Sequence, residues 1–410
     1  MDNRSADLNA ATDELFAHLS DQSGTVKPIQ HHEYQARMKR LAQLLEQSPF
    51  DAMICEGGAT MQYLSGMSWG HSERLFCLVV TAAGEHFWLC PHFEADRTQK
   101  IIEAKDGDGQ PAGPGGKIVT WHEHEYPFAP LAVALSARNV DRVAVEPALR
   151  HRFVHGLALE LGQHRVEAGL ELLVELRGRK DEHELQLLRK ANEMTQLAIS
   201  AAAEHIRVGM TGADISRLMQ RAQRKLGLTD IWDLSLIQED AAYPHGNADG
   251  RTLDKGEVLL VDTGGDLHGY KSDNTRSWVP VGPVSQSVEQ VWNTVRDAQK
   301  AAFDVIRPGG PCQIVDQAAR QVISEQGLGK GYKYFSHRLG HGIGMEGHED
   351  PYFDGGSQVI MAPGMTFSNE PGVYIVGELG IRIEDIVVVT DKGADHFGSW
   401  QAGPSSPGAK

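Results

Sequence analysis

Five residues in the second half of the chain carry side chains that bind divalent metal ions: Asp262, Asp273, His341, Glu370 and Glu384. Four carboxylates and one imidazole that converge on one place would repel each other strongly if no cation were present. Such oxygen-rich sets suit hard divalent cations, and carboxylates can bridge two of them. A pair of metal ions that activates a water molecule is the apparatus of a hydrolase. These residues therefore predict metal-dependent hydrolytic chemistry.

Two segments with strand character present the four carboxylates in pairs. Asp262 ends the apolar run VLLVD and Asp273 follows eleven residues later in GYKSDNTR, which indicates a hairpin with one carboxylate on each strand. Glu370 in MTFSNEPGVYI and Glu384 in LGIRIEDIVVV form a second pair. Arg382 lies two residues before Glu384 and shares a face with it on a strand. Either hairpin alone would also fit a structural turn or an ion pair, but the two together favour a cation site.

Glycines surround the one histidine of this set. His341 lies in RLGHGIG, where the missing side chains leave room for the backbone of a substrate. A single histidine in a glycine-rich loop is often structural, but His245, His337 and His348 occur nearby or in a similar context. Imidazoles beside a metal site can orient a substrate carbonyl and stabilise the oxyanion formed from it. These three histidines are therefore candidate catalytic or substrate-binding residues.

The first half of the chain has the alternation of elements that favours an α/β domain. A helical stripe begins at His31, and short apolar runs with strand character follow it: DAMIC, RLFCLVV, HFWLC, KIVTW and RVAVE. The second and third runs (74–80 and 86–90) predict a hairpin. The glycine-rich segment 106–116 lacks the Walker pattern and is expected to be a surface loop.

A highly charged segment, ELRGRKDEHELQLLRK (175–190), opens a long helix and marks the start of a second domain. We expect a flexible lead-in over residues 1–30, an N-terminal domain over 31–174 and a catalytic domain over 175–400. The last ten residues, 401–410, are rich in Gly, Pro and Ser, which predicts a disordered tail.

The second domain contains a weak internal repeat. Residues 201–215 align with 301–315 at an offset of 100, and each copy reads as the end of one helix, a glycine turn and the start of another. The alignment predicts a pseudo-twofold domain in which each half presents strands to a central site. Two unrelated helix–turn–helix joints would give the same pattern.

Composition excludes several classes of function. The chain has 410 residues, of which 41% are hydrophobic and 23% charged, and no stretch approaches the roughly 20 apolar residues of a membrane span. Its first residues lack the apolar core of a signal peptide, which favours a cytoplasmic protein. The net charge of −16 argues against nucleic acid as a partner, because a phosphate backbone requires a basic surface. The four cysteines show no CxxC spacing and are expected to be buried free thiols.

At the metal-ligand motifs the sequence resembles the pita-bread metallopeptidases, the family that includes prolidase (Xaa-Pro dipeptidase) and aminopeptidase P. The five ligands match residue for residue, and the three further histidines match in spacing. The resemblance covers roughly 175–395 and extends, through weaker motifs such as MQYLSG, over 31–170. It implies a mixed α/β (α+β) fold, with a creatinase-like N-terminal α/β domain followed by a pseudo-twofold pita-bread catalytic domain.

The resemblance also implies a role for each ligand. Asp262 would bind one metal ion, His341 and Glu370 the other, and Asp273 and Glu384 would bridge the pair. Each subunit would hold two divalent ions, Mn²⁺, Co²⁺ or Zn²⁺, and spacing does not choose among them. A hydroxide held between the metals would attack the scissile carbonyl.

The resemblance implies further roles for five residues around the metals. Glu370 would also shuttle the proton, while His245 and His348 would hold the carbonyl oxygen and the tetrahedral intermediate. His337 and Arg382 would bind substrate, with Arg382 supporting the site and placed to meet the substrate's carboxylate.

The chain departs from the family pattern at Leu267, where a tyrosine usually stands two residues before Gly269. On a strand, Leu267 would share a face with Gly265 beside the metal-bearing turn. A leucine there would deprive the site of one hydrogen-bond donor, unless water or another group replaces it.

The family resemblance further implies a homodimer in which the N-terminal domain of one subunit closes the active site of its partner. Trp69 and His71, in SGMSWGHSER, are candidates for that contribution. Packing of Trp69 in the core of its own domain is the alternative.

The leading functional prediction is a dinuclear metallopeptidase that cleaves Xaa-Pro dipeptides. Aminopeptidase P, which accepts longer peptides, is the nearest alternative. Small-molecule C–N hydrolases and lyases, such as ectoine hydrolase and dimethylsulfoniopropionate lyase, also use this scaffold, and fold alone does not fix the substrate. Creatinase and the peptide- or histone-binding members work without metal, but those members have lost ligands that this chain retains.

Overall fold

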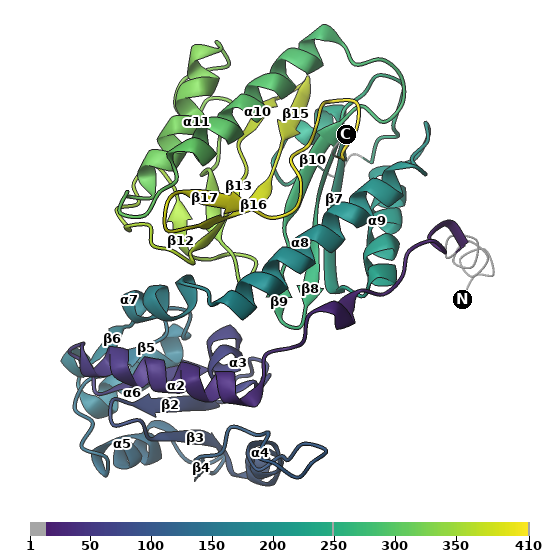
Figure 1. Cartoon of the computed structure of the whole chain (residues 1–410). Coiled ribbons are helices and arrows are strands. Elements are labelled where there is room, and N and C mark those ends of the chain that lie inside the picture. The colour runs from purple at the N-terminus through teal and green to yellow at the C-terminus, as the bar shows by residue number, and fades with distance from the viewer. Residues whose placement is uncertain (1–13, 248–249, 409–410) are drawn as a thin grey trace. The chain divides into compact units, whose positions relative to one another are not determined.

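The computed structural model describes residues 14–247 and 250–408, and the chain forms two compact units (Figure 1). One unit spans Ile29–Arg177 and the other spans Gly178–Lys410 together with the residues up to Pro28. Within the described residues, no helix is both long and apolar enough to cross a membrane.

The N-terminal unit is built on a six-stranded sheet with the order β4-β3-β2-β1-β5-β6. Its strands are β1 Ala52–Glu56, β2 Cys77–Thr81, β3 His86–Pro91, β4 Lys117–Trp121, β5 Val143–Val145 and β6 Val166–Ala168. Its α-helices are α2 His31–Glu46, α3 Ala59–Ser65, α4 Ala95–Ile102, α5 Phe128–Ser136, α6 His151–Leu161 and α7 Leu170–Leu173. Strands β2 and β3 pair antiparallel, which confirms the predicted hairpin.

Apolar side chains explain why this sheet forms. Every residue of β1 and β2 is buried, as expected for strands covered on both faces. Helix α2 begins with a capping box formed by Gln30 and Glu33, and it buries Met38, Leu41 and Leu45 of the predicted stripe. All four cysteines are buried and unpaired, as the sequence predicted.

Among its described residues, the C-terminal unit contains two pairs of α-helices and three small sheets. The helices are α8 Glu182–Ala203, α9 Gly212–Leu226, α10 Gln286–Val305 and α11 Gln313–Glu325. The first sheet, with the order β10-β8-β7 and β9 paired to β8, comprises β7 Thr229–Ile237, β8 Leu259–Leu267, β9 Tyr270–Lys271 and β10 Asn274–Trp278. The second, β12-β11-β13-β16-β17, comprises β11 Gly340–Gly342, β12 Glu349–Phe353, β13 Thr366–Asn369, β16 Asp385–Val389 and β17 Ala394–His396. The hairpin β14 Gly372–Ile375 and β15 Leu379–Arg382 forms the third.

The internal repeat is confirmed in backbone detail. Gly209 between α8 and α9 has φ 88°, and Gly309 between α10 and α11 has φ 87°, so both turns need the left-handed conformation that glycine adopts without strain. The Gly209 amide donates to the carbonyl of Leu253, and the Gly309 amide donates to that of Met361. Helices α8 and α9 pack on the first sheet, while α10 and α11 contact strands of the second and third. The two halves therefore repeat one helix–turn–helix and sheet unit, as Figure 1 shows.

Both ends of the chain, as far as they are described, pack on the C-terminal unit. Phe16 and Leu19 are buried, and the Gln22 amide donates to the carbonyl of Leu226. This differs from the expected flexible lead-in, because apolar side chains anchor residues 14–28. It differs likewise from the expected disordered tail. The buried side chain of Gln401 donates to the carbonyls of Ser277, Gly403 and Ser406, which holds residues 401–408 in place.

Candidate metal centre

The structure brings the five proposed ligands together from both halves of the C-terminal unit. Asp262 lies in β8, Asp273 directly before β10, His341 in β11, Glu370 directly after β13 and Glu384 between β15 and β16. Their ligand atoms form overlapping triads within 4.8 Å, one made by His341, Glu370 and Glu384 and another by Asp262, Asp273 and Glu384. Two neighbouring cation positions with shared carboxylates are therefore possible.

One cavity of about 850 Å³ is lined by all nine residues predicted as metal ligands, catalytic residues or substrate-binding residues. These are the five ligands, Arg382 and three histidines, His245, His337 and His348. The rest of its wall includes apolar groups, among them Trp232, Leu234 and Pro244.

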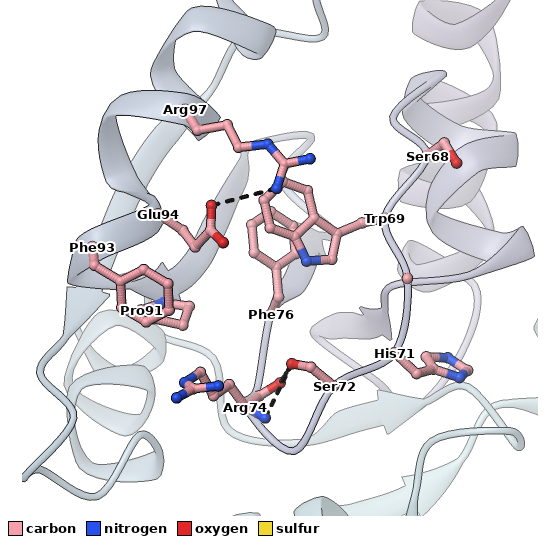
Figure 2. Close-up of a pocket in the computed structure, with 11 residues that line it drawn as sticks. Ser68, Trp69, His71, Ser72, Arg74, Phe76, Pro91, Phe93, Glu94 and Arg97 are labelled. Atoms are coloured by element: carbon pink, nitrogen blue, oxygen red, sulfur yellow. Dashed lines mark hydrogen bonds and ion pairs between the residues drawn. The ribbon is translucent and has the colours of Figure 1, made fainter.

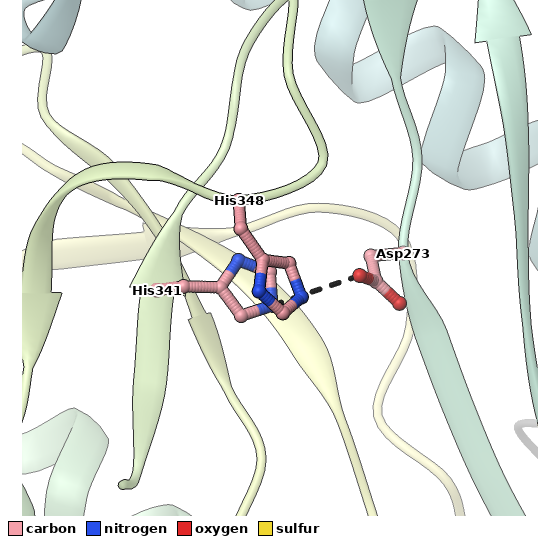
Figure 3. Close-up of side chains that lie close together, drawn as sticks. All are labelled: Asp273, His341 and His348. Carbon is pink, nitrogen blue, oxygen red and sulfur yellow. Dashed lines mark ion pairs between the residues drawn. The ribbon is translucent and has the colours of Figure 1, made fainter. Parts of the chain in front are cut away.

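Distances within the cluster are those of groups that face a common ion. His341 Nε2 lies 3.3 Å from Glu370 Oε1 and 3.7 Å from Asp273 Oδ2. The His341 Nδ1 atom lies 3.1 Å from the carbonyl oxygen of Gly342, so this nitrogen carries the proton and Nε2 keeps a lone pair for a metal. Figure 3 shows the imidazole and the Asp273 carboxylate directed toward each other.

The charges of this cluster are costly without a cation. Burial raises the pKa of Asp273 and of Glu384 well above the usual range, and the neighbouring carboxylates raise both further. Burial likewise raises the pKa of Glu370 to about 8. Within the described part of the chain, the buried atoms Asp273 Oδ1 and Glu384 Oε1 have no hydrogen-bond partner. Unpartnered, buried carboxylate oxygens at the centre of such a set fit divalent cations.

Thr275 and Arg382 organise the carboxylates from behind. Thr275 Oγ1 lies 2.9 Å from Asp262 Oδ1 and 2.6 Å from Glu384 Oε2, and its single proton serves one of them at a time. Arg382 donates from Nη2 to Asp262 Oδ2 at 2.7 Å and from Nη1 to the Tyr374 hydroxyl at 2.9 Å. Its Nε donates to Thr275 Oγ1 at 3.1 Å, and the residue is only 3% exposed. Each guanidinium nitrogen thus has a partner in the protein, and contact of Arg382 with a substrate stays a prediction.

The accessory histidines differ in how far they are engaged. His348 stacks on the ring of His341 with 3.7 Å between centroids, and burial lowers the pKa of both, that of His341 to about 3 (Figure 3). His337 is held on both sides, with Nδ1 2.7 Å from the Arg338 carbonyl and Nε2 2.7 Å from the Tyr374 hydroxyl. Since Arg382 donates to that hydroxyl, the hydroxyl donates to His337. The His337 ring therefore has no free nitrogen for a substrate in this arrangement.

The prediction that Leu267 faces the metal site is wrong. Along β8, Asp262 points into the cavity, whereas Thr263 bonds to Gln223 and to the Trp232 carbonyl on the opposite face. Side chains alternate along a strand, so Leu267 shares the face of Thr263 and Gly265. It is 1% exposed and does not line the cavity.

We therefore expect Leu267→Tyr to overpack this layer and to destabilise the protein by roughly 1–3 kcal/mol. Turnover per folded, metal-loaded molecule should stay unchanged, because the phenol is directed away from the cavity. Urea unfolding and turnover of the metal-loaded variant check both statements. Faster turnover would show that the phenol does reach the reacting groups.

Trp69 and His71 lie at a second cavity, of about 330 Å³, inside the N-terminal unit. Trp69 stacks on Phe76 with centroids 4.0 Å apart, and the Arg97 guanidinium lies 4.5 Å from the centre of the Trp69 ring (Figure 2). His71 lies at the side of this group in the same view. Trp69 is thus held by partners in its own unit, and a contribution to a partner subunit stays a prediction.

Sequence reasoning missed Thr275 and Tyr374, whose hydroxyl groups contact Asp262, Glu384, His337 and Arg382. Thr275 follows Asp273 by two residues and could have been found from strand alternation, because both then face the same side. Tyr374 follows Glu370 in EPGVY and meets Arg382 through the pairing of β14 with β15. Hydroxyl-bearing residues are common, so their types gave no signal by themselves.

A carboxylate-rich, histidine-lined cavity built from two related halves fits the class of metal-dependent hydrolases. Residues 186–391 match the metallopeptidase family M24, and residues 37–178 match the creatinase/prolidase N-terminal domain. The chain belongs to metallopeptidase family M24. This confirms the resemblance, the mixed α/β fold and the creatinase-like character of the N-terminal domain.

Relatives of known name are similar over most of the chain. The probable dipeptidase PepE of Mycobacterium tuberculosis is 33% identical over 363 residues, which cover 88% of this chain and 93% of the relative. The Xaa-Pro dipeptidase of Lactobacillus delbrueckii subsp. lactis is 31% identical over 367 residues, covering 88% and 96%. The crystal structure of dipeptidase PepE from Mycobacterium ulcerans superposes with a TM-score of 0.84 at 30% identity, covering 93% of this chain and 100% of that one.

Proposed function

We propose that this protein hydrolyses the peptide bond before proline in Xaa-Pro dipeptides, with two divalent metal ions bound by Asp262, Asp273, His341, Glu370 and Glu384. The observation that carries the proposal is the convergence of buried carboxylates whose inner oxygens have no partner among the described residues. Relatives named dipeptidase and Xaa-Pro dipeptidase support the substrate class.

The chemistry of the ligand set indicates which ion to try first. Four carboxylates and one imidazole favour Mn²⁺, although Co²⁺ and Zn²⁺ also accept these ligands. When bound, the ions supply an activated water and polarise the scissile carbonyl. Asp273 and Glu384, each present in two of the triads, are the residues placed to bridge.

The remaining residues of the cavity position the substrate and handle protons. Glu370, beside His341 and hydrogen-bonded by Ser368, is placed to accept a proton from the attacking water and pass it to the leaving nitrogen. His245 and His348 line the cavity and would hold the carbonyl oxygen as it gains charge. The apolar wall at Trp232, Leu234 and Pro244 would receive the proline ring or the side chain before it.

The test is hydrolysis of Ala-Pro, Leu-Pro and Ala-Pro-Ala by purified protein with added Mn²⁺, with Ala-Ala as a control. We expect the two Xaa-Pro dipeptides to be cleaved fastest. Preference for Ala-Pro-Ala would make the protein an aminopeptidase of longer peptides. Hydrolysis of none of the four would refute the proposal and favour a small-molecule C–N hydrolase.

Assembly as a homodimer follows from the family resemblance and is part of the same proposal. Light scattering at the enzyme's working concentration should give twice the chain mass of 44.9 kDa. A monomer that is fully active would contradict a role for the partner subunit.

A further inference from the structure

Three buried polar side chains contact the segments that carry the metal ligands without lining the cavity: Arg276 of β10, Gln299 of α10 and Asp385 of β16. Arg276 is 2% exposed, and Gln299 and Asp385 are 0% exposed. Burial of polar and charged groups costs free energy unless each group finds a partner. The partners of these three residues therefore indicate what the residues do.

Gln299 bonds to the peptide groups that precede both glutamate ligands. Its Nε2 atom lies 3.2 Å from the carbonyl oxygen of Asn369 and 3.4 Å from that of Ile383. These two residues come directly before Glu370 and Glu384. The Asn369 side chain donates in return to the Gln299 carbonyl at 2.9 Å. One side chain of α10 thus spans the two chain segments that present the glutamates.

Arg276 joins a third segment to the same point. Its Nη1 atom donates to the carbonyl of Thr275 at 3.0 Å and to that of Glu384 at 2.6 Å. Its Nη2 atom donates to Asp385 Oδ1 at 2.6 Å, while Asp385 Oδ2 accepts from Gln299 at 3.0 Å. Thr275 also contacts two of the metal ligands through its hydroxyl. Arg276, Gln299 and Asp385 therefore form one buried network that holds three ligand-bearing segments together.

Packing alone does not require these residue types. The buried face of α10 is otherwise formed mostly by apolar residues, and the internal repeat places the buried Ile199 of α8 at the position equivalent to Gln299, 100 residues earlier. The Arg276–Asp385 ion pair, at 2.6 Å, likewise adds little stability over apolar residues of similar volume. The contacts with the ligand segments are what apolar residues could not supply.

We propose that Gln299, Arg276 and Asp385 are positioning residues that fix Glu370 and Glu384 and so set the affinity of the site for divalent metal. The inference rests on the proposed function through its metal site, not through its substrate. A carboxylate whose peptide backbone is already fixed loses less conformational entropy when it binds an ion. Residues behind metal ligands contribute roughly 10- to 100-fold in metal affinity, and the network should contribute on this scale.

The experiment measures Mn²⁺ binding to metal-stripped protein by calorimetry, in wild type and in Gln299→Met, which keeps the side-chain volume but removes the amide. The variant should bind Mn²⁺ roughly 10- to 100-fold more weakly. Its hydrolysis of Ala-Pro should fall at low Mn²⁺ and should largely recover at high Mn²⁺, with the KM for Ala-Pro unchanged. Thr294→Val is the matched control, because the buried Thr294 hydroxyl donates to the Gln290 carbonyl of the same helix. It should bind Mn²⁺ as the wild type does.

Loss of stability is measured separately, as the melting temperature of each metal-free variant. Ile323→Ala leaves a cavity in the buried face of α11, so it should melt at a lower temperature than wild type but keep the wild-type affinity for Mn²⁺. A lower melting temperature of Gln299→Met with wild-type Mn²⁺ affinity would overturn the inference, because the network would then only stabilise the fold.

Arg276→Lys decides the question if Gln299→Met does not fold. The lysine keeps a positive charge beside Asp385, but one ammonium group cannot replace the guanidinium fork that reaches the carboxylate and the carbonyls of Thr275 and Glu384 together. Its affinity for Mn²⁺ should fall about tenfold or more. Wild-type affinity in this variant would contradict the positioning role.

The same titrations separate this inference from the proposed function. A wild type that binds two Mn²⁺ ions but cleaves no Xaa-Pro dipeptide refutes the proposed substrate alone, and the affinities of the variants still decide the role of the network. A wild type that binds none of Mn²⁺, Co²⁺ and Zn²⁺ refutes the metal site and this inference with it. Wild-type affinity in both Gln299→Met and Arg276→Lys overturns the inference and leaves the proposed function standing.

Discussion

Asp273→Asn should lower turnover of a Xaa-Pro dipeptide by more than about a hundredfold and reduce the metal content below two ions per chain. Partners behind metal ligands typically contribute 10- to 100-fold, so a residue placed to bridge two ions should contribute at least that much. Asp266→Asn is the matched control. Asp266 is an aspartate of the same hairpin, but it bonds to the Gly269 amide and to Lys271, away from the cluster. It should retain metal and most activity.

The same substitution should have the opposite effect on the metal-free protein. Because burial and neighbouring carboxylates raise the pKa of Asp273, ionising this group in the folded state costs free energy as the pH rises above the unfolded-state value. Asparagine removes that cost. Metal-stripped Asp273→Asn should therefore melt at a higher temperature than metal-stripped wild type at pH 7. The difference should shrink at low pH, where both states are protonated. If metal-free Asp273→Asn were less stable than metal-free wild type at pH 7, then burial of the ionised Asp273 among other carboxylates would not destabilise the protein.

The variants His348→Ala and His341→Ala should show which of the two stacked imidazoles binds metal and which one holds the substrate carbonyl. The atoms of Asp273, His341 and His348 also form a possible triad, so His348 is an alternative ligand by geometry. If His348 instead holds the carbonyl oxygen, its loss should lower kcat roughly 10²- to 10³-fold with metal content intact. His341→Ala should lose metal as well as activity. The metal content and kcat of both variants decide between these roles. Loss of metal from His348→Ala would show that His348 is a metal ligand.

The convergence of the four carboxylates and His341 could be predicted from sequence because its evidence is local. Asp262 lies within β8 and Asp273 directly before β10, while Glu370 directly follows β13 and Glu384 directly precedes β16. Two pairs of acidic residues on neighbouring strand segments together favour a cation site, although neither pair does so alone. The internal repeat was also visible, since Gly209 and Gly309 occupy equivalent left-handed turns.

Features that depend on distant partners could not be predicted in the same way. The composition of the last ten residues indicates disorder, but Gln401 binds the carbonyl of Ser277, more than a hundred residues earlier. Arg382 was expected to support the site, but only the folded structure shows that it does so by donating to Asp262, Thr275 and Tyr374. Leu267 shares a face with Gly265 as expected, but that face lies away from the cavity. Counting alternation from Asp262 would have placed it opposite the metal site.

The most direct test of the account is a titration of metal-stripped protein with Mn²⁺, with bound metal and hydrolysis of Ala-Pro followed in parallel. We predict no hydrolysis by the stripped protein, binding that saturates at two ions per chain, and activity that appears as those sites fill. Glu384→Gln, titrated beside it, should bind fewer ions and remain inactive. Full hydrolysis of Ala-Pro by the stripped protein would contradict the central claim that these carboxylates and His341 act through bound metal.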